Sequence, residues 1–162
     1  MQLNKTIFYF FCIMLFSIQT ASSQKLPPFD TCAKKQGPQI VLDPPVLKFG
    51  KVSVQNATAS KTVKLYNKGD SDLIITNLRV SCGCVSVSFK SGKNKSPYFG
   101  IYGSTPGWKE KIAPASYAEL TVILDLTDYP VSEGIQIKDI FISSNGTRNP
   151  ELILKVEMET IK

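Results

Sequence analysis

The stretch that most constrains the fold runs from Leu73 to Val85. It is rich in aliphatic residues and ends in two closely spaced cysteines, Cys82 and Cys84. From Asn77 onward its odd-numbered positions are mostly polar. Its even-numbered positions form an almost wholly apolar set: Ile74, Thr76, Leu78, Val80, Cys82 and Cys84. Because successive strand residues point to opposite faces, the pattern predicts a strand buried on one side, with both sulfurs directed toward the core or its rim.

Other segments show the same alternation of apolar and polar residues, and turns rich in Gly, Pro and Asn separate them. No long stretch has the 3.6-residue period of an amphipathic helix. The chain is therefore predicted to be all-β, an Ig-like antiparallel β-sandwich with Greek-key connections and about seven strands, over residues 40–162. The further strand segments are 40–42, 46–49, 61–66, 117–126, 135–142 and 152–158.

Asp43-Pro44-Pro45 separates the first two of these segments. Proline has no N–H to donate to a β-ladder, so both segments are expected at sheet edges. An edge strand at Val46–Phe49 would be open to pairing with an extended segment of a partner.

The N-terminus has the features of an export signal. A basic start is followed by an apolar run over 6–18 and by Ala21-Ser22-Ser23, which fits signal-peptidase cleavage. Residues 1–23 are predicted to be a signal peptide and 24–39, with three prolines and a glycine, an irregular leader. The mature chain would fold outside the cytoplasm and would not span a membrane, since the apolar run is too short and no second one follows.

Charge and composition argue against several functions. The formal net charge is +6, but the lysines are scattered, and the tightest group (Lys90, Lys93 and Lys95) lies in a polar loop without a basic–aromatic motif, so no nucleic-acid partner is expected. The chain has no histidine, which removes Ser-His and Cys-His nucleophile arrangements and the commonest metal ligand. We therefore expect a protein that is not an enzyme and that carries no cofactor.

The mature chain has three cysteines, Cys32, Cys82 and Cys84, and three interpretations stay open for them. They can be structural, since thiols pack as small apolar groups and Gly83 permits a tight bend. They can be redox-active, with Cys82 paired to Cys84 or one of the two paired to Cys32. They can also bind a soft metal, because two thiolates one residue apart suit Cu(I) or Zn(II).

Residues 90–108 form a long connection that reads as an insertion. It carries four aromatic residues: Tyr98, Phe99, Tyr102 and Trp108. Exposed aromatics on a long loop are typical of binding surfaces. The alternative is that the same rings fold back and cover a sheet edge or the end of the sandwich.

Four short motifs resemble a known family. They are Phe49-Gly50-Lys51-Val52, Asn67-Lys68-Gly69, Leu73-Ile74-Ile75 and Ser81-Cys82-Gly83-Cys84. Together they are similar to the bacterial domain-of-unknown-function family 1573, and Ser144-Asn145 fits the Ser/Thr-Asn of the last hairpin. The family's Pro-Gly turn reads Pro114-Ala115 here, which removes the residue that adopts a positive φ most easily.

The resemblance implies an exported sandwich related to the hydin and major-sperm-protein group, whose members act mainly as interaction modules. It assigns no activity. It places the protein in the periplasm or at the cell surface of a Gram-negative bacterium. Gly50, Gly69, Gly83 and Pro114 would then have turn and structural roles.

Two functions follow as expectations. The first is a non-enzymatic interaction or structural module of the cell envelope, which would bind an envelope or extracellular protein through the Val46–Phe49 edge or the aromatic 90–108 segment. The second is a thiol protein that uses Cys82 and Cys84 to hold Cu(I) or Zn(II) or to exchange electrons with a redox partner.

Overall fold

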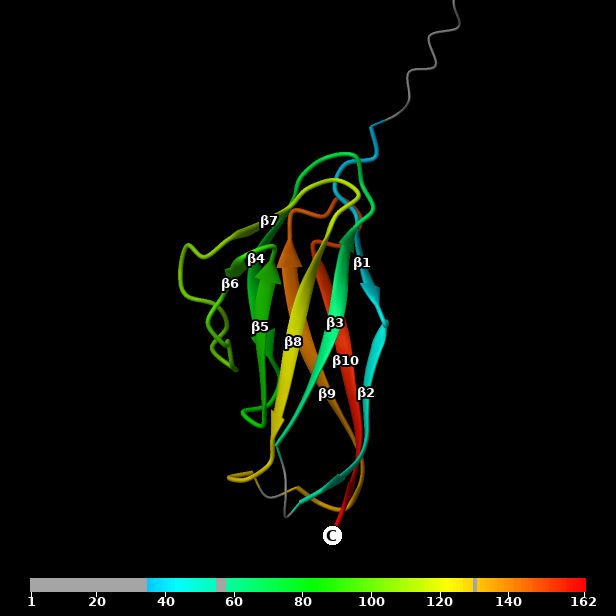
Figure 1. Cartoon of the computed structure of the whole chain (residues 1–162), viewed down its shortest axis with the longest axis vertical. Helices are drawn as coiled ribbons and strands as arrows, with labels where there is room; N and C mark the ends of the chain where they lie inside the picture. Colours follow the sequence, from blue (N-terminus) through cyan, green and yellow to red (C-terminus); the bar gives the residue numbers. More distant parts are fainter. Residues whose placement is uncertain (1–34, 55–57, 130) are drawn as a thin grey trace, which may run out of the picture. The chain divides into compact units, whose positions relative to one another are not determined.

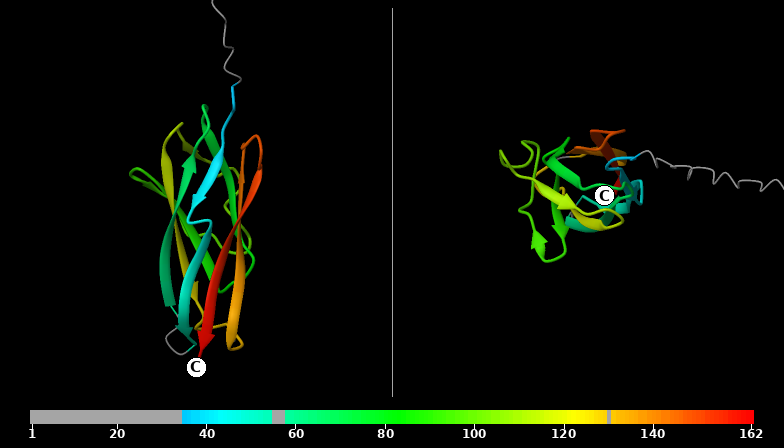
Figure 2. Two further views of the ribbon diagram at one scale, coloured as in Figure 1. Left: turned by 90° about the vertical axis from the view of Figure 1, so that its right-hand side faces the viewer. Right: turned by 90° about the horizontal axis from the view of Figure 1, so that it is seen from above.

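A computed structural model describes residues 35–54, 58–129 and 131–162, and this part of the chain contains strands and turns but no helix. The strands form two five-stranded sheets that face each other (Figures 1 and 2). The first sheet has the order β1 (Ile40–Asp43), β3 (Thr58–Asn67), β8 (Tyr117–Asp125), β5 (Val85–Ser91) and β6 (Asn94–Lys95). The second has the order β2 (Val46–Ser53), β10 (Glu151–Ile161), β9 (Gly134–Ser144), β4 (Leu73–Val80) and β7 (Glu110–Ile112). The predicted Ig-like sandwich with Greek-key connections is confirmed.

The described residues contain ten strands, whereas about seven were predicted. The three additional strands are β5, β6 and β7. The sequence run that begins at Leu73 was taken as one strand to Val85, but β4 ends at Val80 and β5 starts at Val85 in the opposite sheet. The strands β6 and β7 lie inside the long connection and have only two and three residues, too few to show an alternating pattern.

The N-terminal strand changes sheets at its prolines. Asp43 ends β1 in the first sheet, Val46 begins β2 in the second, and the Asp43–Pro44 peptide bond is cis. Both strands lie at sheet edges, as the prolines predicted. The pairing of β2 with β10 is parallel, so the sandwich is not purely antiparallel as predicted. The reason is that β2 enters the second sheet from β1 rather than through a hairpin.

The alternation predicted for β4 is wrong over its first half. The pairing of β4 with β9 shifts by one residue between Ile75 and Asn77, so that Thr76 is the additional residue of a β-bulge. Before the shift Leu73 and Ile75 are buried, and after it Leu78 and Val80 are. The predicted inward positions Ile74 and Thr76 are half-buried and exposed, respectively.

The core lies between the sheets and follows period-two alternation in the long strands. In β8 the buried positions are the even-numbered residues from Ala118 to Leu124, and in β10 they are the even-numbered residues from Leu154 to Thr160. Each of the larger buried aliphatic side chains contributes on the order of 1.5–3 kcal/mol relative to an exposed one. The largest fully buried side chains are Phe89, Leu65, Leu73, Ile75, Leu78, Ile112, Leu120, Leu124, Ile140, Ile142, Leu154 and Met158.

The side chain of Asn67 ties one end of the sandwich together. Asn67 is the last residue of β3 and is fully buried. Its Oδ1 accepts hydrogen bonds from the N–H groups of Gln39 (3.3 Å) and Gly69 (3.0 Å). Its Nδ2 donates to the carbonyls of Ser71 (2.8 Å) and Ile112 (3.0 Å). The amide thus satisfies four backbone groups that come from the segment before β1, from the turn after β3 and from β7.

Gly69 lies in the same turn, as the resemblance implied, and close approach of another segment explains its identity. An added Cβ at Gly69 would overlap the carbonyl oxygen of Gly37 and would lie 2.7 Å from the nitrogen of Gln39. Both are backbone atoms, so no side chain can move aside to relieve the contact. Gly50, by contrast, lies where the pairing of β2 with β10 shifts register, and its φ of 78° is easily adopted only by glycine.

The turn at Pro114-Ala115 keeps the conformation of a glycine turn without the glycine. Ala115 has a φ of 55°, the only positive value among the non-glycine residues that the structure describes. Its N–H donates to the carbonyl of Asn67 (3.0 Å), and the carbonyl of Ser116 accepts the N–H of Asn67 (2.9 Å). These two bonds with Asn67 hold Ala115 in a region that L-residues with a Cβ avoid.

The predicted signal peptide (1–23), most of the leader (24–34) and Cys32 lie outside the described residues. In the described ranges no helix is long and apolar enough to cross a membrane.

Replacing Asn67 by alanine is expected to destabilise the protein by about 3 kcal/mol, because several buried backbone groups lose their partners at once. Chemical denaturation of the mature protein measures this change. The matched control is Asn94→Ala in β6, where the side chain is exposed and the change should stay within about 0.5 kcal/mol. Equal effects of the two substitutions would contradict the role assigned to Asn67.

Replacing Ala115 by glycine is expected to stabilise the protein by about 0.5–1 kcal/mol. The positive φ costs a residue with a Cβ roughly 1–2 kcal/mol, and the greater freedom of glycine in the unfolded chain cancels part of that gain. Ala113→Gly, two residues earlier and not at a positive φ, should instead destabilise. Thermal or chemical unfolding of the two variants compares the signs, and destabilisation by both would show that Ala115 is unstrained.

Candidate functional site

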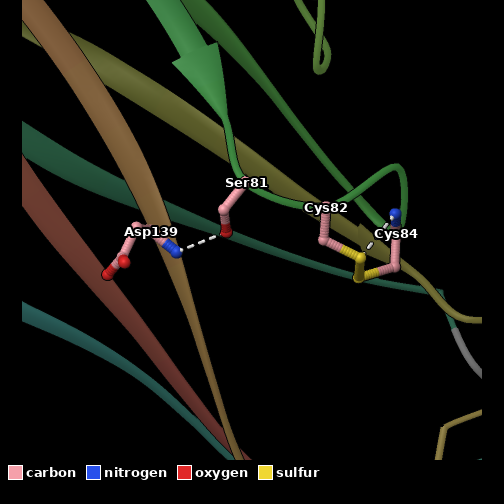
Figure 3. The surroundings of a disulfide bond; sticks show 4 residues. All are labelled: Ser81, Cys82, Cys84 and Asp139. Atoms are coloured by element: carbon pink, nitrogen blue, oxygen red, sulfur yellow. Dashed lines mark hydrogen bonds between the residues drawn. A yellow bond between two sulfur atoms is a disulfide. The ribbon is translucent and has the colours of Figure 1, made fainter.

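The cysteines predicted to be functional form a disulfide within one turn (Figure 3). Cys82 and Cys84 are joined to each other, with their Cα atoms 5.2 Å apart. Cys82 is partly exposed, whereas Cys84 is fully buried in the core cluster. The N–H of Cys84 points at the sulfur of Cys82 (3.2 Å), and the N–H of Val85 donates to the carbonyl of Cys82 (3.1 Å). Of the cysteine pairings left open by the sequence, the structure therefore has the one between Cys82 and Cys84.

In this oxidised form neither sulfur is a thiolate, which is the form that binds metals and attacks electrophiles. No group of three or more Cys, Asp or Glu side chains that could hold a metal ion occurs in the described part of the chain.

A neighbouring side chain, and not a positive φ, limits the space at Gly83. It does not have a positive φ. An added Cβ would overlap the hydroxyl of Tyr129 and would lie 2.7 Å from that ring's Cζ. The tyrosine, in the connection after β8, therefore lies directly against the disulfide turn. The sequence predicted a tight bend at Gly83, but it gave no sign of this contact because Tyr129 is far away along the chain.

Ser81 fixes the disulfide turn to β9. Its N–H donates to the carbonyl of Asp139 (2.9 Å), and its Oγ accepts the N–H of Asp139 (2.9 Å) (Figure 3). The serine hydroxyl thus takes the place of a backbone carbonyl in the last rung of the β4–β9 pairing. Beyond this rung the chain turns away toward β5.

The predicted aromatic segment divides into a hairpin and a loop. Lys90 and Ser91 belong to β5 and pair with β6, so the irregular part is shorter than predicted and runs over residues 96–109 between β6 and β7. We call this part the aromatic loop. Phe99 pairs with Val87 of β5 as an isolated bridge, and the N–H of Val80 donates to the carbonyl of Gly100 (3.3 Å). The loop therefore contacts strands of both sheets.

Two of the four predicted aromatic residues cover the core. Phe99 is buried and Trp108 is partly buried. The Trp108 ring packs edge-on against Phe99 and Phe89, with centroid distances of 5.0 and 5.9 Å. These two rings follow the covering alternative rather than the binding one.

The other two aromatic residues are exposed. Tyr102 is 94% exposed, and Tyr98 and Ile101 beside it are 44% and 43% exposed. Asn77 of β4 fixes the backbone next to Tyr102, because its Oδ1 accepts both the N–H (3.0 Å) and the hydroxyl (2.9 Å) of Ser104. The four predicted residues are thus not one surface: the structure brings Tyr98 and Tyr102 to solvent and Phe99 and Trp108 to the core.

A cleft that the sequence did not indicate lies beside the Pro114-Ala115 turn. It is an open depression of about 470 Å³, lined by Lys90, Gly92, Ala115, Ser116, Tyr117 and Glu119. Lys90 and Glu119 form an ion pair across it at 3.5 Å. None of the predicted site residues lines this cleft, because its walls are assembled from β5, β8 and two turns that are distant in sequence.

One carboxyl group has a shifted pKa. The side-chain and backbone hydrogen bonds of Thr127 lower the pKa of Asp125 below its usual value. Asp125 is exposed at the end of β8, where this bond stabilises a turn.

Trp108→Ala is expected to destabilise the protein by about 2–3 kcal/mol, since it removes a large ring from the core cluster. Tyr102→Ala should change the stability by less than about 0.5 kcal/mol, because that ring touches solvent. Chemical denaturation of the two single variants measures both values. A Trp108→Ala variant as stable as Tyr102→Ala would show that the tryptophan does not anchor the loop.

Comparisons with known proteins extend the sequence resemblance. A family model described as "Protein of unknown function (DUF1573)" matches residues 40–96. A search of curated proteins finds no match to this chain.

Several solved structures resemble this chain to different degrees. A protein of unknown function from Porphyromonas gingivalis W83 superposes with a TM-score of 0.57 at 16% identity, over 82% of this chain and 51% of that one, so this chain spans about half the length of that protein. The CsuC–CsuE chaperone–tip adhesion subunit complex of Acinetobacter baumannii matches with a TM-score of 0.40 at 12% identity, over 75% of this chain and 52% of that one. The ASH/PapD-like domain of human CEP192 gives 0.41 at 9%, over 89% and 98%.

At 16% identity the Porphyromonas gingivalis structure bears on the fold and not on the function, and the other two, with TM-scores of 0.40 and 0.41, support no argument. The family is indicated by the sequence itself, through the Phe-Gly-Lys-Val, Asn-x-Gly and Ser-Cys-Gly-Cys motifs that all fall within the matched segment. The resemblance of this chain to the bacterial domain-of-unknown-function family 1573 is thereby confirmed, over residues 40–96.

Proposed function

We propose that the protein is an exported, non-enzymatic Ig-like module that binds another envelope or extracellular protein through the tip of its aromatic loop. One observation carries this proposal. Tyr102 is 94% exposed, although the loop around it is fixed on both sides by buried or hydrogen-bonded residues. A side chain whose only role was to complete the core would lie in the core and would not be exposed to solvent on a fixed backbone.

The fixed backbone favours binding because little conformational entropy remains to be lost. Phe99 and Trp108 anchor the two ends of the loop in the core cluster. Between them Gly103 has a φ of 79°, and a Cβ there would lie 2.7 Å from the Oδ1 of Asn77. These contacts restrict the conformations open to the tip of the loop.

The composition of the tip suits a protein partner. Tyrosine is enriched among the residues that contribute most to binding energy at interfaces, since it combines a large apolar ring with one polar group. Tyr98 and Ile101, close to Tyr102 in sequence, add partly exposed apolar surface to the loop, and the ammonium of Lys95 lies 5.3 Å from the centre of the Tyr98 ring. A partner with an apolar patch edged by acceptor groups would complement this tip.

The non-enzymatic part of the proposal has separate support. The chain lacks histidine, the side chain that most often transfers protons in catalysis near neutral pH. Binding of a partner protein without a cofactor is consistent with the lack of histidine. Export is supported by the basic and apolar start of the sequence.

The thiol alternative concerns a different site. Binding of Cu(I) or Zn(II) by Cys82 and Cys84 requires that their disulfide first be reduced, since thiolates are the ligands. Only Cys82 offers an exposed sulfur-bearing side chain to an attacking thiolate, because Cys84 is fully buried. This alternative predicts nothing for the aromatic loop, so experiments on Tyr102 distinguish the two functions.

Photo-crosslinking tests the binding proposal. A benzoylphenylalanine introduced at Tyr98 in the full chain, expressed with its own N-terminus in a Gram-negative host that contains the partner, is expected to form a defined protein adduct. Tyr102→Ala in the same chain should remove that adduct, since the main contact of the tip is lost. The matched control is Tyr117→Ala, which removes a tyrosine of 47% exposure from the outer face of β8 and should leave the adduct unchanged.

Loss of the adduct with Tyr117→Ala but not with Tyr102→Ala would overturn the loop assignment. Circular dichroism of all variants checks that the fold is kept.

A further inference from the structure

Half of strand β9 has a neighbour on one side only. The strand β10 pairs with β9 over its whole length, from Gly134 to Ser143. On the other side β4 pairs only with residues Ile140 to Ser144 and contributes a last rung through Ser81 and Asp139. There the disulfide turn carries the chain away into β5 of the opposite sheet. No described strand pairs with the outer side of Gly134–Lys138, which we call the open edge; the first half of β9 lies at the margin of its sheet (Figure 2).

The direction of the backbone groups along the open edge follows from the last rung. The carbonyl of Asp139 accepts a bond from Ser81, so the backbone groups of Asp139 point away from β10. In an antiparallel ladder this direction alternates with every residue, and the β9–β10 pairing has no register shift. Ile137 and Ile135 therefore point their N–H and C=O groups outward. Gly134 fits the alternation, since its carbonyl accepts the Thr160 hydroxyl of β10 (3.0 Å).

The side chains on the open edge are unusual for an exposed strand. Ile135 and Ile137 are 74% and 54% exposed on the outer face of the sheet. Exposed edges normally avoid such residues, because free backbone groups beside apolar side chains invite another strand to pair.

Most other strand edges are protected in recognisable ways. The Thr58–Val63 part of β3 extends past β1 and also lacks a strand on that side, but its exposed side chains are polar. In β10 the residues Glu151–Leu154 extend past β2, and Ile153 is the one exposed apolar side chain among them. In β2 the ammonium of Lys61 caps the carbonyl of Lys48 (2.6 Å), and Gly50 lies at a register shift. The edge strands β6 and β7 have two and three residues, and β1 has four. Strand addition at Val46–Phe49, expected from the sequence, is thus less favourable than strand addition at β9.

The charge beside the open edge indicates what would pair with it. Lys138 lies on the opposite face from the two isoleucines, is partly buried and makes no ion pair within the described residues. The whole chain also has a formal net charge of +6. A segment that places apolar residues beside Ile135 and Ile137 and an acidic residue beside Lys138 would complement both faces.

We propose that the open edge of β9 accepts, by strand addition, an extended segment of a partner protein in which apolar and acidic residues alternate. The backbone groups of Ile135 and Ile137 would exchange hydrogen bonds with the segment, and Lys138 would pair with one of its carboxylates. This site is separate from the aromatic loop, and either can exist without the other.

A second copy of the chain is a poorer occupant. Two copies would bring together two chains of the same positive charge, and a pair of five-residue segments buries far less than the roughly 1,200 Å² that stable interfaces need. An acidic partner segment avoids the charge repulsion, and the favourable charge pairing with Lys138 compensates in part for the small buried area.

Amide hydrogen exchange of the mature protein, measured by NMR, tests the open edge directly. In the free protein the amides of Ile135 and Ile137 are expected to exchange at least about 100-fold faster than those of Gln136 and Lys138, which face β10. Adding a short synthetic peptide of alternating valine and glutamate is expected to slow Ile135 and Ile137 alone. Equal protection of all four amides in the free protein would overturn the proposal.

Variants of the chain and of the peptide locate the binding. Ile137→Lys is expected to weaken peptide binding by at least about tenfold, since it places a charge in the apolar row. The matched control is Ile153→Lys on the outer face of β10, an isoleucine of 44% exposure away from the open edge, which should leave the affinity unchanged. A valine–lysine peptide should bind at least about tenfold more weakly than the valine–glutamate peptide.

Three further outcomes would contradict the proposal. The first is equal weakening by Ile137→Lys and Ile153→Lys, which would indicate non-specific attraction. The second is no slowing of exchange at Ile135 and Ile137 at saturating peptide. The third is concentration-dependent protection of these amides without any peptide, with a dimer in sedimentation, which would assign the edge to a second copy.

Discussion

The hydrogen bonds of the buried Asn67 side chain determine how one end of the sandwich is built. Four backbone groups from three segments meet on its amide, and its own backbone binds Ala115 and Ser116. The carbonyl of Ile112 is bound in the buried interior and the other three groups are part-buried, so loss of the asparagine would leave them poorly satisfied. Gly69 needs its small size for the same reason: the segment before β1 can reach the amide only if it passes directly over that residue.

At the other end of β4, a single-residue bulge and a turn closed by a disulfide position both proposed binding surfaces. The additional residue Thr76 changes which side chains face outward, so that Asn77 reaches Ser104 of the aromatic loop and Arg79 lies 4.1 Å from the centre of the Phe141 ring on β9. The turn at Cys82–Cys84 then ends the pairing with β9. The bulge thus places Asn77 for its hydrogen bonds with Ser104, and the turn marks where β4 stops short of the open edge.

The sequence predicted those features that depend on local alternation. The strands β3, β8 and β10 were expected because their apolar residues repeat with period two over many residues, and the prolines correctly placed β1 and β2 at edges. The bulge in β4 could not be predicted, because Thr76 is an ordinary strand residue and only pairing with β9 shows that it is additional. The division of the aromatic residues was likewise hidden: Phe99 and Trp108 differ from Tyr98 and Tyr102 only in that Phe89 and the core lie beside them. The open edge exists because β4 ends before it reaches the first half of β9. The sequence of β9 does not indicate where β4 ends.

The two proposed surfaces meet at the last residues of β4. The N–H of Val80 points to Gly100 of the aromatic loop, and the N–H of the next residue, Ser81, points to Asp139 above the open edge. A segment added to the open edge would continue the line of β4 past the disulfide turn. A partner that contributed such a segment and also contacted Tyr102 would bind the two surfaces with one molecule, and the second contact would then form at a high effective concentration. Val80 and Ser81 lead directly into the turn closed by the Cys82–Cys84 disulfide, so this bond would help to hold the end of β4 between the two surfaces. That is a structural role for the disulfide that requires no redox or metal chemistry.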